Sequence, residues 1–148
     1  MKYLFAMLLI SPIFCFSQTD LKVLEIDTSR HIIDEANIIY VHNSDFKKVC
    51  NAVLDAGFTI DKKDNELQTI ETKEPKDNVW IPILFIRIKD SITIIKPKYY
   101  THIGNMWGDG TYKQNKKGKP RQNAIVHAFL QAYKVARLIG GQIECKKE

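Results

Sequence analysis

The chain has 148 residues, of which 45% are hydrophobic and 26% charged, and its 22 Lys and Arg against 17 Asp and Glu give a net charge of +5. This composition is typical of a globular protein and excludes a chain that is disordered throughout. The isoleucine-rich stretch 79–95 is interrupted by Pro82, Arg87 and Lys89, so it is not the run of roughly 20 apolar residues that a membrane-spanning helix needs.

Residues 1–17 have the features of a cleavable secretory signal. Lys2 supplies a positive start, and a short apolar run follows it. The small side chains of Cys15 and Ser17 suit the two pockets of a signal peptidase if cleavage falls just before Gln18. We therefore expect an exported protein that is periplasmic or secreted after cleavage near Ser17/Gln18.

Cys15 raises the alternative of a lipoprotein. A lipid-modified cysteine normally follows a small residue, whereas Phe14 precedes Cys15 here. A membrane anchor is a second alternative, but the apolar run is shorter than a spanning helix requires. Cleavage before Gln18 is therefore the interpretation that we carry forward.

The exported part is expected to hold one domain. Its length suits a single folded unit, which we place at 37–148 after an N-terminal segment at 18–36. Lys22–Ile26 can form a short strand within that segment. Asn37–His42 then begins the domain as an apolar strand.

The first helix is expected over residues 44–56. Asn43 and Ser44 offer an N-cap. Gly57 stands where a left-handed cap residue is needed, and Phe58 supplies the hydrophobic contact that closes such a cap. One apolar stripe at helical spacing predicts the buried face: Phe46, Val49, Cys50, Val53 and Leu54.

Four strands are expected after this helix. Turns at 64–65 and 90–91 join them into antiparallel hairpins. Pro82 indicates that its strand lies at an edge or carries a bulge at that point. The predicted strands are Phe58–Lys62, Glu66–Thr72, Val79–Lys89 and Ile92–Lys96.

Residues 97–121 show no periodicity and are rich in glycine. A structureless connection of this length is uncommon in a compact domain. It is functional, or mobile, or it hides a strand, for which Thr111–Gln114 is the candidate. A second helix is predicted from 122 to 139 and ends at Gly140, and Ile143 can begin a short closing strand.

The order β-α-β-β-β-β-α predicts the fold class. Two amphipathic helices need a common apolar surface, and one face of the sheet is the only large one available. We therefore expect an α+β two-layer sandwich, in which an antiparallel sheet of four to six strands carries both helices on one face.

The segment 44–72, SDFKKVCNAVLDAGFTIDKKDNELQTIET, has a recurrent pattern. A helix ends in Ala-Gly-aromatic, and a strand, an acidic turn and a Thr-ending strand follow. This pattern resembles small envelope domains of the helix-grip or TBP-like kind, including the N-terminal domain of the outer-membrane assembly lipoprotein BamC. The resemblance implies the packing of such a domain and transfers no functional residue.

No catalytic, cofactor or metal motif is present in the sequence. The GxSxG elbow, the P-loop and the CxxC and HExxH zinc spacings are all missing. We therefore expect no catalytic residue, no cofactor and no metal site. The four histidines show no metal-ligand spacing either: His31, His42, His102 and His127.

The two cysteines of the exported part, Cys50 and Cys145, leave two alternatives open. Export permits a disulfide between them. The place of Cys50 on the apolar face of a predicted helix is instead typical of a buried free cysteine.

Positive charge is concentrated in the last third of the chain. Residues 18–95 carry 10 Lys and Arg against 14 Asp and Glu, whereas residues 96–148 carry 11 against 3. Such asymmetry indicates an anionic partner. The alternative is that folding mixes both halves on one surface and removes the bias.

Basic and aromatic residues cluster in the glycine-rich stretch. Cations attract anionic polymers, and aromatic faces stack on sugars or bases. The alternative is a solvated loop whose aromatic side chains cover the edge of the sheet. The predicted binding residues are Lys98, Tyr100, Trp107, Tyr112, Lys113, Lys116, Lys117, Lys119 and Arg121.

Two hypotheses of function follow. The first is a non-enzymatic envelope module that binds or assembles with an anionic envelope component or an acidic protein surface. Nucleic acid is a less accessible partner outside the cell. The alternative is an enzyme of hydrolase-like class with loop 97–121 as its lid. The sequence does not reveal the oligomeric state.

Overall fold

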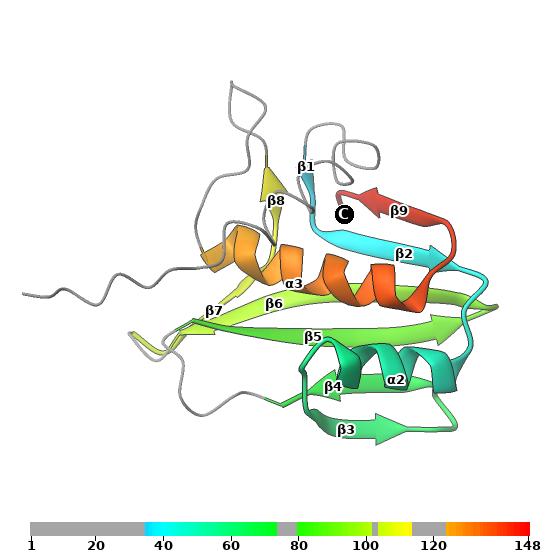
Figure 1. Cartoon of the computed structure of the whole chain (residues 1–148). Helices are drawn as coiled ribbons and strands as arrows, with labels where there is room; N and C mark the ends of the chain where they lie inside the picture. Colours follow the sequence, from blue (N-terminus) through cyan, green and yellow to red (C-terminus); the bar gives the residue numbers. More distant parts are fainter. Residues whose placement is uncertain (1–34, 74–79, 102–103, 114–123) are drawn as a thin grey trace, which may run out of the picture.

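The computed structural model describes residues 35–73, 80–101, 104–113 and 124–148, and Figure 1 shows their arrangement. The helices and strands are β1 (Glu35–Ala36), β2 (Ile38–His42), α2 (Phe46–Asp55), β3 (Ile60–Asp64), β4 (Thr69–Thr72), β5 (Trp80–Lys89), β6 (Ile92–Thr101), β7 (Met106–Asp109), β8 (Tyr112–Lys113), α3 (Ala124–Ile139) and β9 (Ile143–Lys146).

The described strands form one large antiparallel sheet and one small one. The large sheet has seven strands in the order β3-β4-β5-β6-β2-β9, with β7 paired to β6 as well. β1 and β8 form the two-stranded sheet. The α+β class predicted from the sequence is confirmed, and the large sheet has one strand more than the upper limit that we expected.

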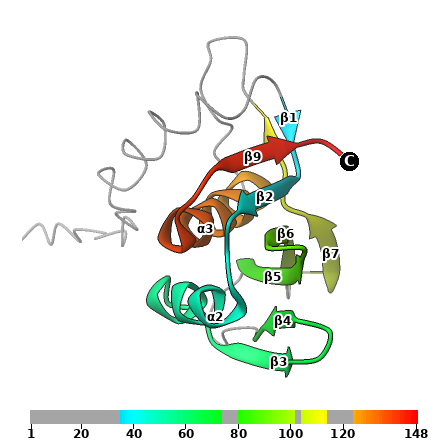
Figure 2. The ribbon, with the colours of Figure 1, turned by 90° about the vertical axis from the view of Figure 1, so that its right-hand side faces the viewer.

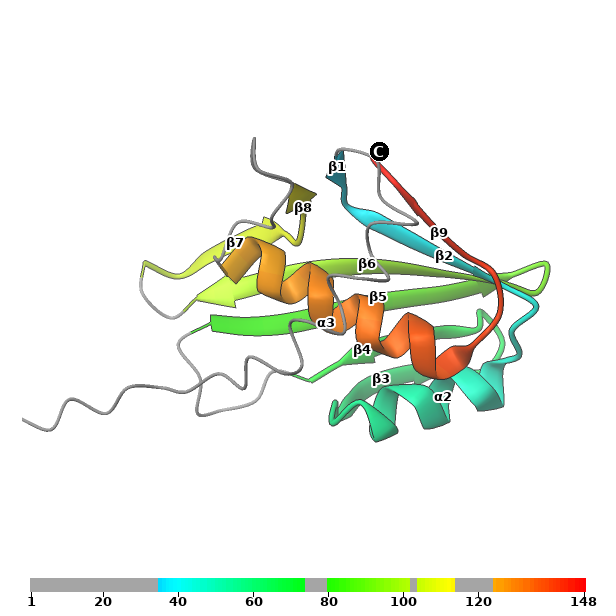
Figure 3. The same cartoon turned by 45° about the horizontal axis from the view of Figure 1, so that its top comes forward.

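Both helices lie on one face of the large sheet, as the turned views in Figures 2 and 3 show. The core between the layers is apolar and contains Phe129, which is fully buried, and the partly buried Phe46 packs against it. The predicted two-layer arrangement is therefore confirmed, and the other face of the sheet, which we call the open face, carries neither helix.

The N-cap of α2 differs from the prediction. Asp45 is the cap, and its carboxylate accepts a hydrogen bond from the Lys48 backbone N–H at 2.9 Å. The Ser44 hydroxyl instead makes a buried hydrogen bond with the Thr93 hydroxyl. An ionised cap also complements the positive end of the helix dipole, which a serine cannot do.

The predicted end of α2 is confirmed. Gly57 has φ +92°, in the left-handed region that favours glycine. Its N–H donates to the Leu54 carbonyl, and the Phe58 N–H donates to that of Val53. These bonds satisfy carbonyl groups that the helix end would otherwise leave unpaired.

The hairpin of β5 and β6 is the centre of the sheet. Its turn residues Asp90 and Ser91 have φ of +52° and +60°, as a tight two-residue hairpin turn of the primed type requires. Pairing extends from Lys89 and Ile92 at the turn to Trp80 and Thr101 at the far end. The predicted hairpin is confirmed, and β6 is twice as long as expected.

Pro82 lies where β5 has no ladder partner on its β4 side. The N–H groups of Leu84 and Ile88 both donate toward β4, to the Thr72 hydroxyl and the Gln68 carbonyl. Because the directions of the backbone N–H groups alternate along a strand, the Pro82 nitrogen also points toward β4. The last β4 pair is Glu71–Phe85, so the proline removes no bond of this ladder.

Much of the stretch expected to lack structure is sheet. β6 continues to Thr101, and β7 follows as its antiparallel partner. The strand that we placed within Thr111–Gln114 is present as β8. Most of the described part of 97–121 is therefore strand, and residues 102–103 and 114–121 lie outside the described residues.

The option of a disulfide between Cys50 and Cys145 is wrong, because both thiols are free. Cys50 is buried on α2, which lies at the side of the sheet formed by β3 and β4 (Figure 2). Cys145 belongs to β9, the strand at the opposite edge.

The expected signal peptide at 1–17 and the strand at 22–26 lie outside the described residues. Ala36, which we placed in the N-terminal segment, is fully buried in the core and pairs with Tyr112. The folded unit therefore includes residues 35 and 36. Within the described ranges, neither helix is long and apolar enough to cross a membrane.

Candidate functional site

The open face of the central hairpin has a regular side-chain pattern. Across β5 and β6, each cation stands opposite an apolar residue. The pairs are Lys89–Ile92, Arg87–Ile94, Phe85–Lys96 and Ile83–Lys98. Four successive pairs therefore each present one positive charge, and we call Lys89, Arg87, Lys96 and Lys98 the central cations.

Strand alternation explains why these residues share a face. Leu84, Ile86 and Ile95 belong to the core beneath the helices, so their neighbours along each strand point to the open face. Even the apolar members of this face are partly covered: Ile83 is 3% exposed and Ile94 half-buried. The charged ends of the central cations are therefore the accessible part of this face.

Two aromatic rings on this face are already covered by cations. Lys98 Nζ lies 5.5 Å from the centroid of the Phe85 ring. Lys146 Nζ lies 5.3 Å from that of Tyr40. Each contact is a cation–π interaction, so these rings hold ammonium groups in place rather than offering a free face to a ligand.

A second aromatic pair stands at the far end of the open face. Tyr100 and Trp107 lie opposite each other on β6 and β7, with ring centroids 4.8 Å apart and an interplanar angle of 43°. The Tyr100 hydroxyl is hydrogen-bonded to Asn105. Trp107 is 56% exposed, and the neighbouring Met106 is equally exposed.

Carboxylates flank the central cations on both sides. Glu71 on β4 pairs with Lys62 at 3.1 Å. Glu148, two residues beyond β9, pairs with Lys96 at 2.6 Å. Among the described residues, no carboxylate lies within ion-pair distance of Arg87, Lys89 or Lys98. The positive charge therefore forms a narrow line bordered by acidic groups.

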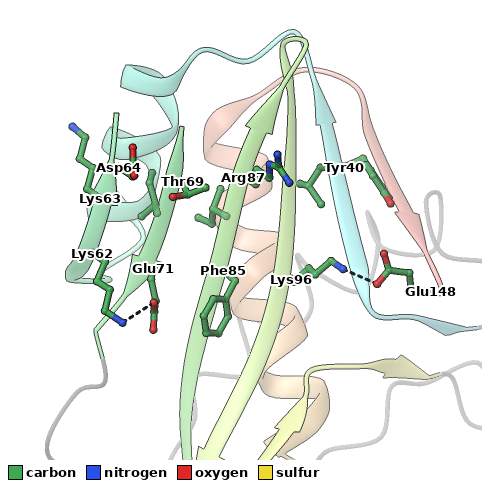
Figure 4. A pocket seen from close by; sticks show the side chains of 13 residues that line it. Tyr40, Lys62, Lys63, Asp64, Thr69, Glu71, Phe85, Arg87, Lys96 and Glu148 are labelled. Carbon is green, nitrogen blue, oxygen red and sulfur yellow. Dashed lines mark hydrogen bonds and ion pairs between the residues drawn. The ribbon is translucent and has the colours of Figure 1, made fainter. Parts of the chain in front are cut away.

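A shallow hollow of about 680 Å³ lies over the middle of this line and is lined by two of the central cations, Arg87 and Lys96. Figure 4 views it from the open face, with the helices behind the sheet. Arg87 stands between Thr69 on one side and Tyr40 on the other, and the two ion pairs mark the borders of the hollow. Its middle is the central hairpin, and its lining extends across the neighbouring strands to Lys62 on β3 and Tyr40 on β2.

Ion pairing shifts the pKa values of charged groups on β9 and β1. A hydrogen bond from Lys146 holds the pKa of Glu144 below its ordinary value, and the same contact raises the pKa of Lys146. Hydrogen bonding to Lys147 lowers the pKa of Glu35. These carboxylates are therefore ionised near neutral pH, and they are stabilised as ions by neighbouring lysines.

The structure separates the residues that the sequence grouped together. Lys98, Tyr100 and Trp107 lie on the open face, as a binding role requires. Tyr112 does not: it is 2% exposed and packs in the core, so it cannot contact a partner. Lys113 lies 3.8 Å from the Glu35 carboxylate. The remaining predicted residues, Lys116, Lys117, Lys119 and Arg121, lie outside the described residues.

The sequence analysis did not place Arg87 and Lys89 among the candidate binding residues, although the signal was present. The predicted turn at 90–91 sets the register, so residue 89 faces 92 and residue 87 faces 94. That register places all four central cations on one face. Which face the helices leave open does not follow from the hairpin alone.

The described residues bring no three His, Cys, Asp or Glu side chains together in a way that could hold a metal ion. Comparison with models of known protein families and with curated protein sequences found no match to this chain.

Proposed function

We propose that the protein is an exported, non-enzymatic binding module that takes an anionic partner on the open face of its sheet. The observation that carries this proposal is the line of central cations, in which Arg87 and Lys98 have no carboxylate partner among the described residues. The export part of the proposal is supported by the signal features of residues 1–17.

Charge alone would be weak support, because exposed lysines are common on any protein. The support comes from arrangement. The cations belong to the two central strands and face one side, while the acidic groups stand on the flanking strands. On the flanking strands Lys62 and Lys146 pair with Glu71 and Glu144, whereas Arg87 and Lys98 on the central strands meet no carboxylate among the described residues.

Binding is favoured over hydrolysis as the proposed role. In the hollow the closest opposite charges are ion pairs, Lys62–Glu71 and Lys96–Glu148. In each pair the carboxylate already contacts an ammonium group, so neither carboxylate is placed as a free general acid or base for a substrate.

The test is salt-titrated binding of the purified protein to envelope fractions. We expect binding to weaken as salt is raised, because screening shortens the reach of the central cations. The double variant Arg87→Ala/Lys98→Ala should lose about tenfold in affinity, since each charge-assisted contact is worth a few kcal/mol at most.

The matched control removes the same charge elsewhere. Lys47 and Lys48 are exposed on α2, on the helical side of the protein. Lys47→Ala/Lys48→Ala should bind like the unchanged protein. Equal losses of affinity in the two double variants would show that binding depends on net charge and not on the position of the cations. Loss only in a Lys116→Ala/Lys117→Ala/Lys119→Ala variant would move the site to residues outside the hollow and contradict the proposal.

A further inference from the structure

The spacing of the central cations matches an extended polypeptide. Successive pairs on the same face of a β-hairpin are two residues apart, which is about 6.7 Å. One cation occurs in each of four successive pairs from Lys89 to Lys98. In an extended chain, side chains that point to the same side are also two residues apart. An extended segment with acidic residues at alternate positions would therefore meet the cations in register.

The structure already contains one such contact. Glu148 lies two residues beyond β9 and places its carboxylate 2.6 Å from Lys96 Nζ. Its backbone N–H donates to the Asn37 side chain at 2.8 Å. The preceding residue, Lys147, is held by Glu35 at 2.9 Å. An acidic residue of this chain thus contacts Lys96, the second of the four central cations counted from Lys98.

The borders of the hollow argue for a narrow ligand. A flat anionic membrane would meet the carboxylates of Glu71 and Glu144 as well as the central cations, and like charges repel. A glycan would stack on aromatic faces, but Phe85 and Tyr40 beside the central cations are covered by the ammonium groups of Lys98 and Lys146, and the exposed Trp107 lies at the far end of the face. A linear chain with intermittent negative charge avoids both problems.

We infer that the open face recognises an extended acidic segment of a partner protein, with Lys96 as the central contact, and that Glu148 occupies this contact when no partner is bound. The inference rests on the proposed function and names its ligand. The partner's carboxylates meet the central cations, and the side chains of its intervening residues point away from the sheet. Glu148 has to leave Lys96 before the partner's carboxylate can bind there.

The probe is a blocked nine-residue peptide in which Glu alternates with Thr, labelled for fluorescence anisotropy. We expect Lys96→Ala to weaken its binding about tenfold, through loss of a charge-assisted contact. Glu148→Gln should strengthen binding about two- to fivefold, because an exposed ion pair that competes with the ligand is removed. The Lys47→Ala/Lys48→Ala variant should bind the probe unchanged.

A second peptide with the same composition, but with its Glu residues in one block, tests the register. It should bind several-fold more weakly, since adjacent residues of an extended chain point to opposite sides. Equal binding of the two peptides would overturn the inference, and so would an unchanged affinity in Glu148→Gln.

Vesicles of anionic phospholipid and an acidic polysaccharide serve as further probes. If either binds through Lys96 and the alternating peptide does not, the peptide inference fails and the proposed function stands. If none of the probes nor any envelope fraction binds in a manner that depends on Arg87 and Lys98, the proposed function fails as well.

Discussion

The ring of Tyr112 packs against that of Phe129, with centroids 5.8 Å apart and an interplanar angle of 49°. This contact joins β8 to α3, and both side chains are almost fully buried. A residue that the sequence placed in a binding surface is thus part of the core. Trp107, in the same stretch of sequence, is 56% exposed.

Tyr112→Ala should lower the free energy of unfolding by about 3–5 kcal/mol, the cost of removing a large buried aromatic side chain. Trp107→Ala should cost less than about 1 kcal/mol, because over half of its surface stays in water. Urea unfolding of both variants measures the difference. Similar losses in the two variants would show that Tyr112 does not hold β8 to the helix.

Thr72→Val tests a buried hydrogen bond between strands. The Thr72 hydroxyl, in a side chain that is 2% exposed, accepts from the Leu84 N–H at 2.9 Å. Valine keeps the shape and leaves this N–H without its partner, which should cost about 1–3 kcal/mol. Thr72→Ser retains the acceptor and is the matched control. Thermal melts that rank serine below valine would contradict this role of the hydroxyl.

Gly141→Ala should destabilise the protein more than Gly57→Ala. Both glycines have positive φ, +118° and +92°, so each alanine carries backbone strain of about 1–2 kcal/mol. A Cβ on Gly141 would also collide with the His42 backbone carbonyl, whereas one on Gly57 meets nothing within 4 Å. Chemical denaturation gives both values. An equal cost would mean that the turn before β9 can shift away from β2.

The two thiols should react slowly in the folded protein. Burial raises the pKa of Cys145 to about 12, so at pH 8 its thiolate is roughly a thousandfold scarcer than that of an ordinary cysteine. Cys50 is buried in the core. A thiol reagent should label both residues promptly only after denaturation. Rapid labelling of Cys145 in the native protein would show that β9 detaches readily.

The local elements follow from the sequence because their causes are local. Gly57 and Phe58 end α2 as expected, since a left-handed residue is needed there and glycine adopts that conformation readily. The turn at Asp90 and Ser91 likewise fixes the central hairpin and its register. Two apolar helix stripes then require one shared face, so the α+β sandwich was predictable as well.

Other features depend on distant parts of the chain. Residues 97–101 and 106–109 lack a strong periodic signal and become strands because β6 and β7 pair with each other. Tyr112 is buried because α3 lies over it, and Glu148 reaches Lys96 because β9 pairs with β2. Pairing and burial of this kind come from residues far apart in sequence, so periodicity within one segment cannot reveal them. The sequence by itself determined the helices, the turns and the fold class, and only tertiary packing decided which lysines and aromatic residues share the open face.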